Sequence, residues 1–553
     1  MAGFDPSCNL PTDMQSILDS NYKAPGCAAT RLCCTLGPAS RSVEVLEQLL
    51  RAGMHIARLD FSWGSREFHQ ETLDNLRAAM RSTGELCAVM VDTTGPESRV
   101  RNPQNGVLEF VAGERVVVTP DESAVPSKSV LPVNRMEVRS AHVGSVIQVG
   151  MYLSSGDASR TARLRVESME GECVTCVVEN SVALDGQQLT VQFDCGSERD
   201  ALTEDDIALL KDFHAANNIE FVGLSFCRSA ADVNFCRHIL AQIGLTETQV
   251  FAKIESIAGL TNHEDILDAA DGLVFSRGNL GVQLAPEKTI LAQHLLLGAA
   301  NLRGKPVFVT RLCDSMVEVP RPTRAEATDV ANLVLNGADG VILGQETFRG
   351  LYPVACATTV MRICDQAERH VNSHMHYLKL MAESGTYVGK RLDYRESLAS
   401  TAVRAVEKLD AKLIVCFTGT GETARVLAKY KPSVPIIAVV LPALTTDGIK
   451  WCVKGHMKAR QVLAYRGVIP LLAHTNSDVP RNRGSLLNFA LDFARRAGLV
   501  HDQDLVVVQE CPRGRHSGLV KSLRMSEADL HCAASLPPTS AAPNDELHLT
   551  GGP

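Results

Sequence analysis

The chain of 553 residues lacks the features that mark several classes of protein. It has no apolar run of the eighteen or so residues that a membrane-spanning helix needs, so we expect no membrane segment. Its formal net charge of −8 argues against a general binder of nucleic acid or of membrane surfaces. The first residues, Met1–Pro6, form neither a basic nor an apolar region for secretion. These absences together predict a cytoplasmic protein.

The seventeen cysteines also lack the pattern of a disulfide framework, because they are scattered and odd in number. In a cytosolic protein they are expected to be reduced and mostly buried. Cys173 and Cys176 have the spacing of half a zinc site, but no second pair completes it. Packing is therefore the favoured interpretation of this pair.

What the chain does have is a regular alternation of strands and helices, which predicts a parallel sheet. The length implies three or four domains. Counting β runs on both sides of a helix-free stretch gives the eight strands that a (β/α)₈ barrel requires. The predicted organisation is an N-terminal arm (1–27), the barrel (28–99 and 198–370), a small β-barrel lid (100–197), a further α/β domain (371–525) and a disordered tail (526–553).

The segment Lys253-Ile-Glu255 is the most informative motif. Residues two apart on a strand point to the same side, so one strand end presents a positive charge and a metal ligand together. About twenty residues later, Arg277-Gly278-Asn279 opens a predicted helix, whose first N–H groups can face an anion. Together these residues predict a site for a phosphorylated carboxylate held by a divalent cation. Asn279 has no charge, where such a site would favour a second carboxylate.

These and other motifs resemble the pyruvate kinase family, in collinear order over roughly residues 28 to 525. Within that family the sequence is most similar to the cytosolic enzymes of plants and green algae. The motifs are Cys33–Arg41, Ala57–Gly64, Asp92–Arg99, Lys253–Glu255, Pro320–Asn332 and Ala464–Pro470.

The resemblance implies a (β/α)₈ barrel with a β-barrel lid and a C-terminal α/β domain, in agreement with the alternation above. It implies transfer of phosphate from phosphoenolpyruvate to ADP in glycolysis, with Mg²⁺ or Mn²⁺ and K⁺ as cofactors. It also implies a homotetramer.

The resemblance further assigns roles to individual residues. Those implied for catalysis are Lys253, Thr310 and Arg58; for substrate, Arg277, Gly278, Asn279 and Thr310; for the nucleotide, Arg58 and Arg99. Glu255 and Asn279 resemble the divalent-metal ligands, and the implied K⁺ ligands are Asp60, Ser62, Asp92 and Thr93. Glu97 is the acidic residue of potassium-requiring members, so potassium dependence is expected.

Several residues depart from the family pattern around the ligands. Asn279 replaces a carboxylate, Asp60 replaces an asparagine, Thr94 replaces a lysine, and Gln188 stands where a phosphate-contacting lysine is expected. Their clustering leaves an alternative open: a catalytically impaired relative that serves as a structural or scaffold subunit of a larger assembly. The retained Lys253 and Glu255 favour an active enzyme.

Overall fold

The structure is a computed structural model. It describes residues 14, 28–96, 98–101, 107–121, 123–133, 138, 141–150, 161–184, 188–193, 200–388, 392–446, 451–473, 483–510 and 518–526. The arm predicted over 1–27 and the tail predicted over 526–553 lie almost entirely outside these residues.

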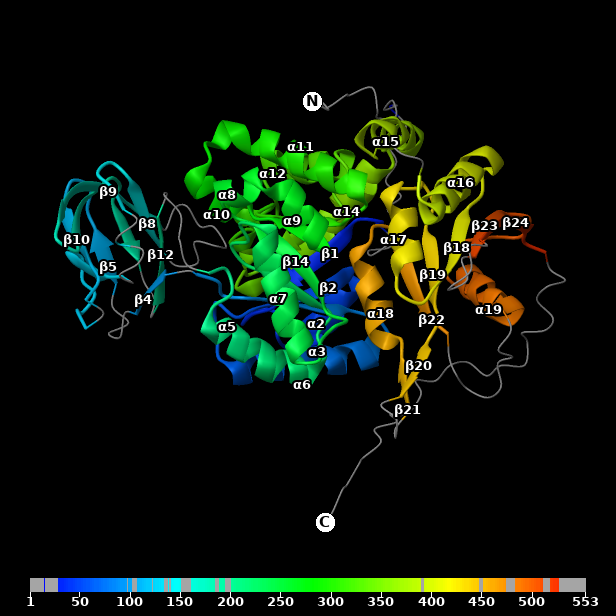
Figure 1. Cartoon of the computed structure of the whole chain (residues 1–553), viewed down its shortest axis with the longest axis horizontal. Coiled ribbons are helices and arrows are strands. Elements are labelled where there is room, and N and C mark those ends of the chain that lie inside the picture. Colours follow the sequence, from blue (N-terminus) through cyan, green and yellow to red (C-terminus); the bar gives the residue numbers. More distant parts are fainter. Residues whose placement is uncertain are drawn as a thin grey trace, which may run out of the picture.

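A closed parallel barrel forms the centre of the molecule, as the strand count predicts (Figure 1). Its strands follow one another around the barrel in the order β1-β17-β16-β15-β14-β13-β3-β2. They are β1 (Arg31–Thr35), β2 (Met54–Asp60), β3 (Ala88–Asp92), β13 (Phe221–Leu224), β14 (Gln249–Ile254), β15 (Gly272–Phe275), β16 (Val307–Thr310) and β17 (Gly340–Leu343).

Helices follow the barrel strands and cover the outer face of the sheet. Several of them start at a Ser or Thr whose side chain accepts a backbone N–H, among them Ser42, Ser65, Thr203, Ser256 and Thr323. The helical elements are α2 (Val43–Arg51), α3 (Arg66–Thr83), α5 (Glu204–Leu209), η4 (Leu210–His214), α6 (Ala215–Asn217), α7 (Ala230–Gln242), α8 (Ile257–Thr261), α9 (His263–Ala269), α10 (Arg277–Gln283), α11 (Pro286–Arg303), η5 (Asp314–Val317), α12 (Arg324–Leu335), α13 (Gln345–Phe348) and α14 (Pro353–Glu368).

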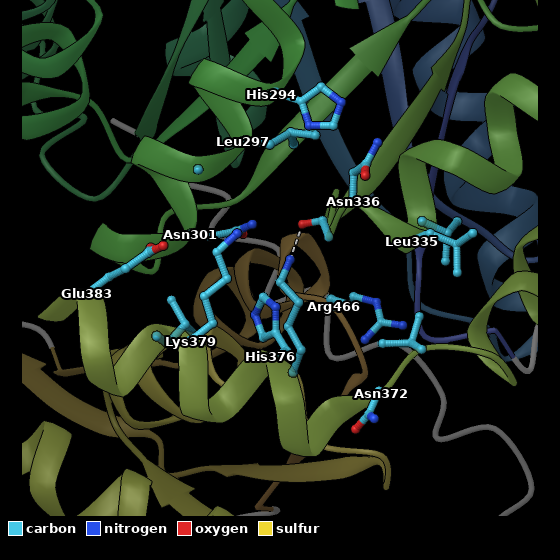
Figure 2. Close-up of a pocket in the computed structure, with 16 residues that line it drawn as sticks. His294, Leu297, Asn301, Leu335, Asn336, Asn372, His376, Lys379, Glu383 and Arg466 are labelled. Atoms are coloured by element: carbon cyan, nitrogen blue, oxygen red, sulfur yellow. Dashed lines mark hydrogen bonds between the residues drawn. The ribbon is translucent and has the colours of Figure 1, made fainter. Parts of the chain in front are cut away.

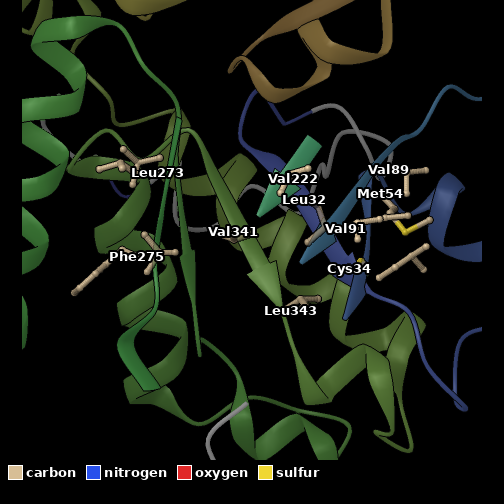
Figure 3. Close-up of a cluster of buried hydrophobic side chains, with 14 of the residues drawn as sticks. Leu32, Cys34, Met54, Val89, Val91, Val222, Leu273, Phe275, Val341 and Leu343 are labelled. Atoms are coloured by element: carbon tan, nitrogen blue, oxygen red, sulfur yellow. The ribbon is translucent and has the colours of Figure 1, made fainter. Parts of the chain in front are cut away.

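The barrel has two apolar layers because side chains alternate across each strand. Leu32 and Cys34 of β1 face outward to the helices, in the cluster that Figure 3 shows. Inside the barrel, Phe251 and Phe308 belong to a separate buried cluster. Glycines in neighbouring strands make room for these rings: a Cβ at Gly340 would lie 2.2 Å from Phe308. The interior is therefore packed, and ligands can reach only the strand ends.

The lid is a separate β unit, drawn in cyan in Figure 1, with an apolar core of its own. Its main sheet has the order β4-β12-β8-β9-β10-β6-β7, and β5 pairs with β11. Cys176 is buried in its core, which agrees with a packing role. The strands are β4 (Ser98–Arg101), β5 (Leu108–Phe110), β6 (Arg115–Thr119), β7 (Val130–Pro132), β8 (Val146–Gly150), β9 (Thr161–Glu170), β10 (Cys173–Val178), β11 (Val182–Leu184) and β12 (Gln188–Phe193).

The C-terminal unit is an α/β sheet of order β22-β19-β18-β23-β24, beside the barrel in Figure 1. The antiparallel strand β24 follows β23 at one edge of this sheet. The elements are α15 (Ser373–Val388), α16 (Tyr394–Leu409), β18 (Leu413–Thr418), α17 (Glu422–Lys429), β19 (Ile436–Val440), β20 (Ala443–Thr446), β21 (Trp451–Lys454), α18 (His456–Gln461), η6 (Val462–Ala464), β22 (Val468–Leu472), α19 (Arg483–Arg496), β23 (Leu505–Glu510) and β24 (Leu519–Arg524).

Among the described residues, no helix combines the length and the apolar character that crossing a membrane requires.

Candidate active site

Lys253 lies at the centre of a buried charge cluster at the carboxyl ends of the barrel strands. Its Nζ is 3.0 Å from Asp92 Oδ2 and 3.4 Å from Glu255 Oε1, so Lys253 and Glu255 do point to the same side of β14. Nζ also donates to Ser225 Oγ at 3.1 Å. Burial works against the charged form, but the carboxylates of Asp92 and Glu255 hold the pKa of Lys253 above its ordinary value. Lys253 is therefore a permanent cation in a water-poor site.

Arg58 is a second buried cation, held by two carboxylates. Its Nε lies 2.8 Å from Asp92 Oδ2 and its Nη2 lies 2.8 Å from Asp60 Oδ2. Its Nη1 donates to Thr35 Oγ1 at 2.9 Å. Burial opposes the charge of Arg58, but Asp92 and then Asp60 raise its pKa; burial likewise opposes the charge of Asp60, but Arg58 and Lys253 lower the pKa of Asp60. The guanidinium is thus fixed in place before any phosphate arrives.

We call the residues with an implied role at potassium the Asp60 side; they are Asp60, Ser62, Asp92 and Thr93. Ser62 donates its backbone N–H and its hydroxyl to Asp60 Oδ1 at 3.0 and 2.5 Å. Asp92 Oδ1 is buried and accepts no hydrogen bond from the described residues. An orphaned carboxylate oxygen among hydroxyls and carboxylates fits an alkali cation, which takes hard oxygen donors.

Glu255 and Asn279, named here the Asn279 side, lie on the other side of Lys253. Asn279 Nδ2 donates to Glu255 Oε1 at 2.8 Å, and the backbone N–H of Phe226 donates to Glu255 Oε2 at 2.8 Å. Phe226 has φ of 51°, a left-handed conformation that is costly for a bulky residue and that aims this N–H. Glu255 and Asn279 are therefore in direct contact, as the sequence predicts.

The Asn279 side can hold a divalent cation, although it offers less negative charge than a site with two carboxylates. Asn279 Oδ1 is buried and has no hydrogen-bond partner among the described residues, so an oxygen donor is free beside the Glu255 carboxylate. Within the same residues, no group of three His, Cys, Asp or Glu side chains gathers to hold a metal. Mg²⁺ commonly binds through one or two carboxylates and completes its shell with water and substrate oxygens. One carboxylate and one amide oxygen meet that requirement at its lower limit.

Arg277 and Thr310 are joined at the next strand ends. Arg277 Nε donates to the carbonyl oxygen of Thr310 at 3.0 Å, and its guanidinium pairs with Asp329 at 2.7 Å. Thr310 Oγ1 lies 3.5 Å from the carbonyl oxygen of Phe275. Gly278 and Asn279 follow Arg277 in α10, both buried. The Arg277 side chain thus fastens the end of β16, which sequence reasoning did not anticipate.

A cavity of about 20 Å³ lies among some of these groups, and Arg58, Asp92, Lys253 and Thr310 all line it. Its far wall includes Glu346, which is 1 % exposed. Burial, together with the negative charge of Asp314, raises the pKa of Glu346 to about 7.

Sequence reasoning missed several residues that shape this site. Ser225 bridges Lys253 to the carbonyl oxygen of Thr93, to which its hydroxyl donates at 2.6 Å. Gly223 lies directly against Asp92: a Cβ there would be 2.0 Å from Asp92 Oδ1. A glycine inside a strand marks a place where another group approaches the backbone closely, so Gly223 in Phe221–Leu224 was a sequence signal of this contact.

Some predicted residues cannot be placed. Arg99 belongs to β4, where it pairs with Thr190, but its side chain and that of Gln188 lie outside the described part of the structure, as does Glu97 altogether. Thr94 is placed: its backbone N–H donates to Asp206 Oδ1 at 2.7 Å.

Comparison with known proteins places this site in a family. Residues 27–357 match the family description "Pyruvate kinase, barrel domain", and residues 396–521 match "Pyruvate kinase, alpha/beta domain". The chain is 41 % identical to "Pyruvate kinase 2, cytosolic" of Oryza sativa subsp. indica over 94 % of this chain and 98 % of that protein. It is 37 % identical to "Pyruvate kinase, cytosolic isozyme" of Glycine max, over 90 % and 96 % of the two chains.

A solved structure agrees with these sequence relatives. The crystal structure of a pyruvate kinase from Cryptosporidium parvum superposes with a TM-score of 0.80 at 29 % identity, covering 93 % of this chain and all of that one. The resemblance inferred from the motifs is therefore confirmed, and the chain belongs to the pyruvate kinase family of phosphotransferases.

Proposed function

We propose that this protein transfers the phosphoryl group of phosphoenolpyruvate to ADP, giving pyruvate and ATP. The observation that carries the proposal is the placement of Lys253 between Asp92 and Glu255, in one cavity with Arg58 and Thr310. In the reaction, the bond from phosphorus to the enol oxygen breaks while a β-phosphate oxygen of ADP bonds to phosphorus. The electron pair left behind forms an enolate, which takes a proton at its terminal carbon to become pyruvate.

Lys253 and Arg58 supply fixed positive charge for this step. Phosphoryl transfer depends on positioning and on stabilising charge that develops at the phosphoryl and leaving oxygens. Lys253 is 6 % exposed and Arg58 is 8 % exposed, so water screens neither of them well. Lys253 is proposed to face the enolate oxygen, and the guanidinium fork of Arg58 to hold the transferring phosphate. Arg99 is proposed to contact the nucleotide phosphates.

Thr310 is proposed to lie beside the carbon that is protonated. Arg277 Nε donates to the carbonyl oxygen of Thr310, and among the described residues the Thr310 hydroxyl makes only a long contact of 3.5 Å, to the carbonyl oxygen of Phe275. That hydroxyl is thus available to substrate or water. Backbone groups of Arg277, Gly278 and Asn279 are proposed to face the carboxylate end of the substrate.

Glu255 and Asn279 would hold Mg²⁺ or Mn²⁺, and Asp60, Ser62, Asp92 and Thr93 would hold K⁺. The divalent ion, when bound, would neutralise phosphate charge and orient the phosphate oxygens. In both places an unpartnered oxygen, Asn279 Oδ1 or Asp92 Oδ1, supports the assignment.

We propose a cytosolic location, because two relatives are named cytosolic, and a homotetramer. Exposed apolar side chains on α11 support contact with a second copy of the chain: Ile290, Leu291 and Leu295 are 45 %, 65 % and 49 % exposed. Sedimentation of the protein and of Leu291→Asp tests this, since a monomeric parent would contradict it. No observation favours the scaffold alternative.

The deciding experiment is pyruvate formation from phosphoenolpyruvate and ADP by the purified protein, with Mg²⁺ or Mn²⁺ and K⁺. Turnover that requires both substrates and a divalent cation is expected. Absence of pyruvate with either divalent cation in the presence of K⁺ would overturn the proposal.

A further inference from the structure

Largely buried carboxylates balance the buried cations of the larger cavity in this molecule. That cavity, of about 120 Å³, lies between the barrel and the C-terminal unit (Figure 2). Its cations Lys431 and Arg466 each have a carboxylate at 3.5 Å, from Asp339 and Glu368 respectively. Charge is therefore balanced within the protein there, and no ligand is required.

Arg311, which lines the cavity around Lys253, has a more exposed partner. It directly follows Thr310 at the end of β16. Its Nε and Nη2 lie 3.1 and 2.9 Å from the same oxygen, Oδ2 of Asp314. The side chains of Arg311 and Asp314 are 24 % and 45 % exposed. Because an ion pair this exposed contributes little net stability, an anion in the cavity can compete with Asp314 for the guanidinium.

The backbone of Arg311 has an unusual conformation. Its φ is 60°, in the left-handed region, which costs free energy for a residue with a long side chain. Arg277 holds it there: Nε donates to the carbonyl oxygen of Thr310 at 3.0 Å, and Nη2 donates to the carbonyl oxygen of Arg311. Residues in such conformations cluster at places that hold ligands. Arg277 thus keeps Arg311 on the wall of the cavity.

The other two guanidinium groups beside this cavity are more firmly engaged. Arg58 is shared by the buried carboxylates of Asp92 and Asp60. Arg277 is bound to two carbonyl oxygens as well as to Asp329. Neither can turn to a ligand without leaving these partners unsatisfied, whereas Asp314 can turn to water.

The two carboxyl groups on the same wall compete weakly for Arg311. Burial raises the pKa of Asp314 above its ordinary value, although Arg311 opposes this. Glu346 accepts the backbone N–H groups of Cys313 and Gly344, at 3.2 and 2.7 Å. With its pKa at about 7, Glu346 carries only part of a negative charge at neutral pH. A ligand carboxylate therefore meets little opposition at Arg311.

We propose that Arg311 binds the carboxylate of phosphoenolpyruvate and so selects an enol phosphate that carries a carboxylate. The inference rests on the proposed function. One carbon of this substrate bears both the enol oxygen, assigned to Lys253, and the carboxylate, so the carboxylate must lie close to Lys253, in the cavity that Arg311 lines. The edge of a guanidinium matches a carboxylate geometrically. The carboxylate takes the place of Asp314, and no covalent bond changes.

The test compares phosphoenolpyruvate with vinyl phosphate, the same enol phosphate with hydrogen in place of the carboxylate. Isothermal titration calorimetry on the full chain, with Mg²⁺ and K⁺ and without ADP, measures both affinities. Arg311→Gln is expected to lose about tenfold in affinity for phosphoenolpyruvate, the scale of one charge-assisted hydrogen bond, and nothing for vinyl phosphate. Arg81→Gln removes an exposed arginine in the last turn of α3 and should leave both affinities unchanged.

The outcomes separate this inference from the proposed function. Unchanged affinities in Arg311→Gln, or an equal loss for both ligands, would overturn the carboxylate contact. If Arg311→Gln does not fold, Arg311→Lys decides: a reduced preference for phosphoenolpyruvate over vinyl phosphate supports the contact, and an unchanged preference overturns it. A parent that binds phosphoenolpyruvate through Arg311 but forms no pyruvate with ADP would overturn the proposed function alone. A parent that does not bind phosphoenolpyruvate would overturn both.

Discussion

The Asp60 side and the Asn279 side of the active site differ in how carboxylates and cations pair. On the Asp60 side, two carboxylates share the guanidinium of Arg58. On the Asn279 side, the single carboxylate of Glu255 receives an ammonium, a side-chain amide and a backbone N–H. Lys253 lies between the two sides and contacts a carboxylate from each.

The resemblance to the family implies that negative charge stands at a different position in this chain. The resemblance to the family places an asparagine at position 60 and a carboxylate at position 279, and this chain has the reverse. Asp60 pairs with Arg58, whereas Asn279 contacts Glu255, which pairs with Lys253, so the two positions act on different cations. The exchange at Asn279 is thus offset by Asp60 in total charge, though not in position.

The largest expected effect comes from removing the cation that both sides share. Lys253→Met should lower kcat roughly a hundredfold to a thousandfold, the scale for losing one preorganised electrostatic donor. Steady-state pyruvate formation at saturating substrate measures it, with circular dichroism to check the fold. The exposed Lys211→Met serves as control and should keep parental turnover. Near-parental turnover in Lys253→Met would show that Lys253 does not have the assigned role.

Glu346 extends the comparison, because among the described residues this buried carboxyl pairs with no cation, whereas Asp92 and Glu255 do. Its pKa is raised to about 7, so the folded state binds the proton more tightly than the unfolded chain does. Stability should therefore fall as pH rises from about 4.5 to 7 and level off above it. Between pH 5 and pH 8, the free energy of unfolding of Glu346→Gln should rise relative to the parent by up to about 3 kcal/mol.

Urea unfolding at the two pH values measures this gain. The exposed Glu287→Gln is the matched control and should show no pH-dependent difference. If Glu346→Gln differs from the parent equally at pH 5 and pH 8, the carboxyl does not titrate in this range.

Restoring a carboxylate sharpens the comparison directly. Asn279→Asp should raise Mg²⁺ affinity by roughly tenfold, because an ionised ligand binds a hard cation more strongly than an amide does. Calorimetry with Mg²⁺ and with Mn²⁺ measures it, and the parent should bind Mn²⁺ more tightly than Mg²⁺. Tight Mg²⁺ binding by the parent would mean that the amide is compensated. No gain in Asn279→Asp would mean that residue 279 does not face the metal.

The smallest effect is expected on the Asp60 side. Potassium should stimulate turnover, and Asp60→Asn should raise the potassium concentration for half-activation by up to about fivefold, as expected for losing one partly exposed charge. Combining Asp60→Asn with Asn279→Asp should recover total charge and give metal affinity close to that of Asn279→Asp alone. Equal rates in potassium and in a bulky organic cation at matched ionic strength would rule out a potassium site.

Local patterns predicted the architecture well. Alternation of strands and helices indicated a (β/α)₈ barrel, and two-residue spacing on a strand indicated that Lys253 and Glu255 face one way. The structure confirms both. The strand and helix pattern is less clear from His370 onward, where the structure forms the helix α15 (Ser373–Val388). The domain boundaries stay a prediction.

The sequence by itself determined the family, the barrel and the residues that carry charge at the strand ends, because periodicity and motif spacing act over a few residues. Only the tertiary structure decided which charges pair. Asp92, Glu255 and Ser225 meet at Lys253 from three different strand ends, and Glu368 reaches Arg466 from almost a hundred residues away. Such contacts form when the barrel closes and the C-terminal unit docks, and no local pattern encodes the distances that set them.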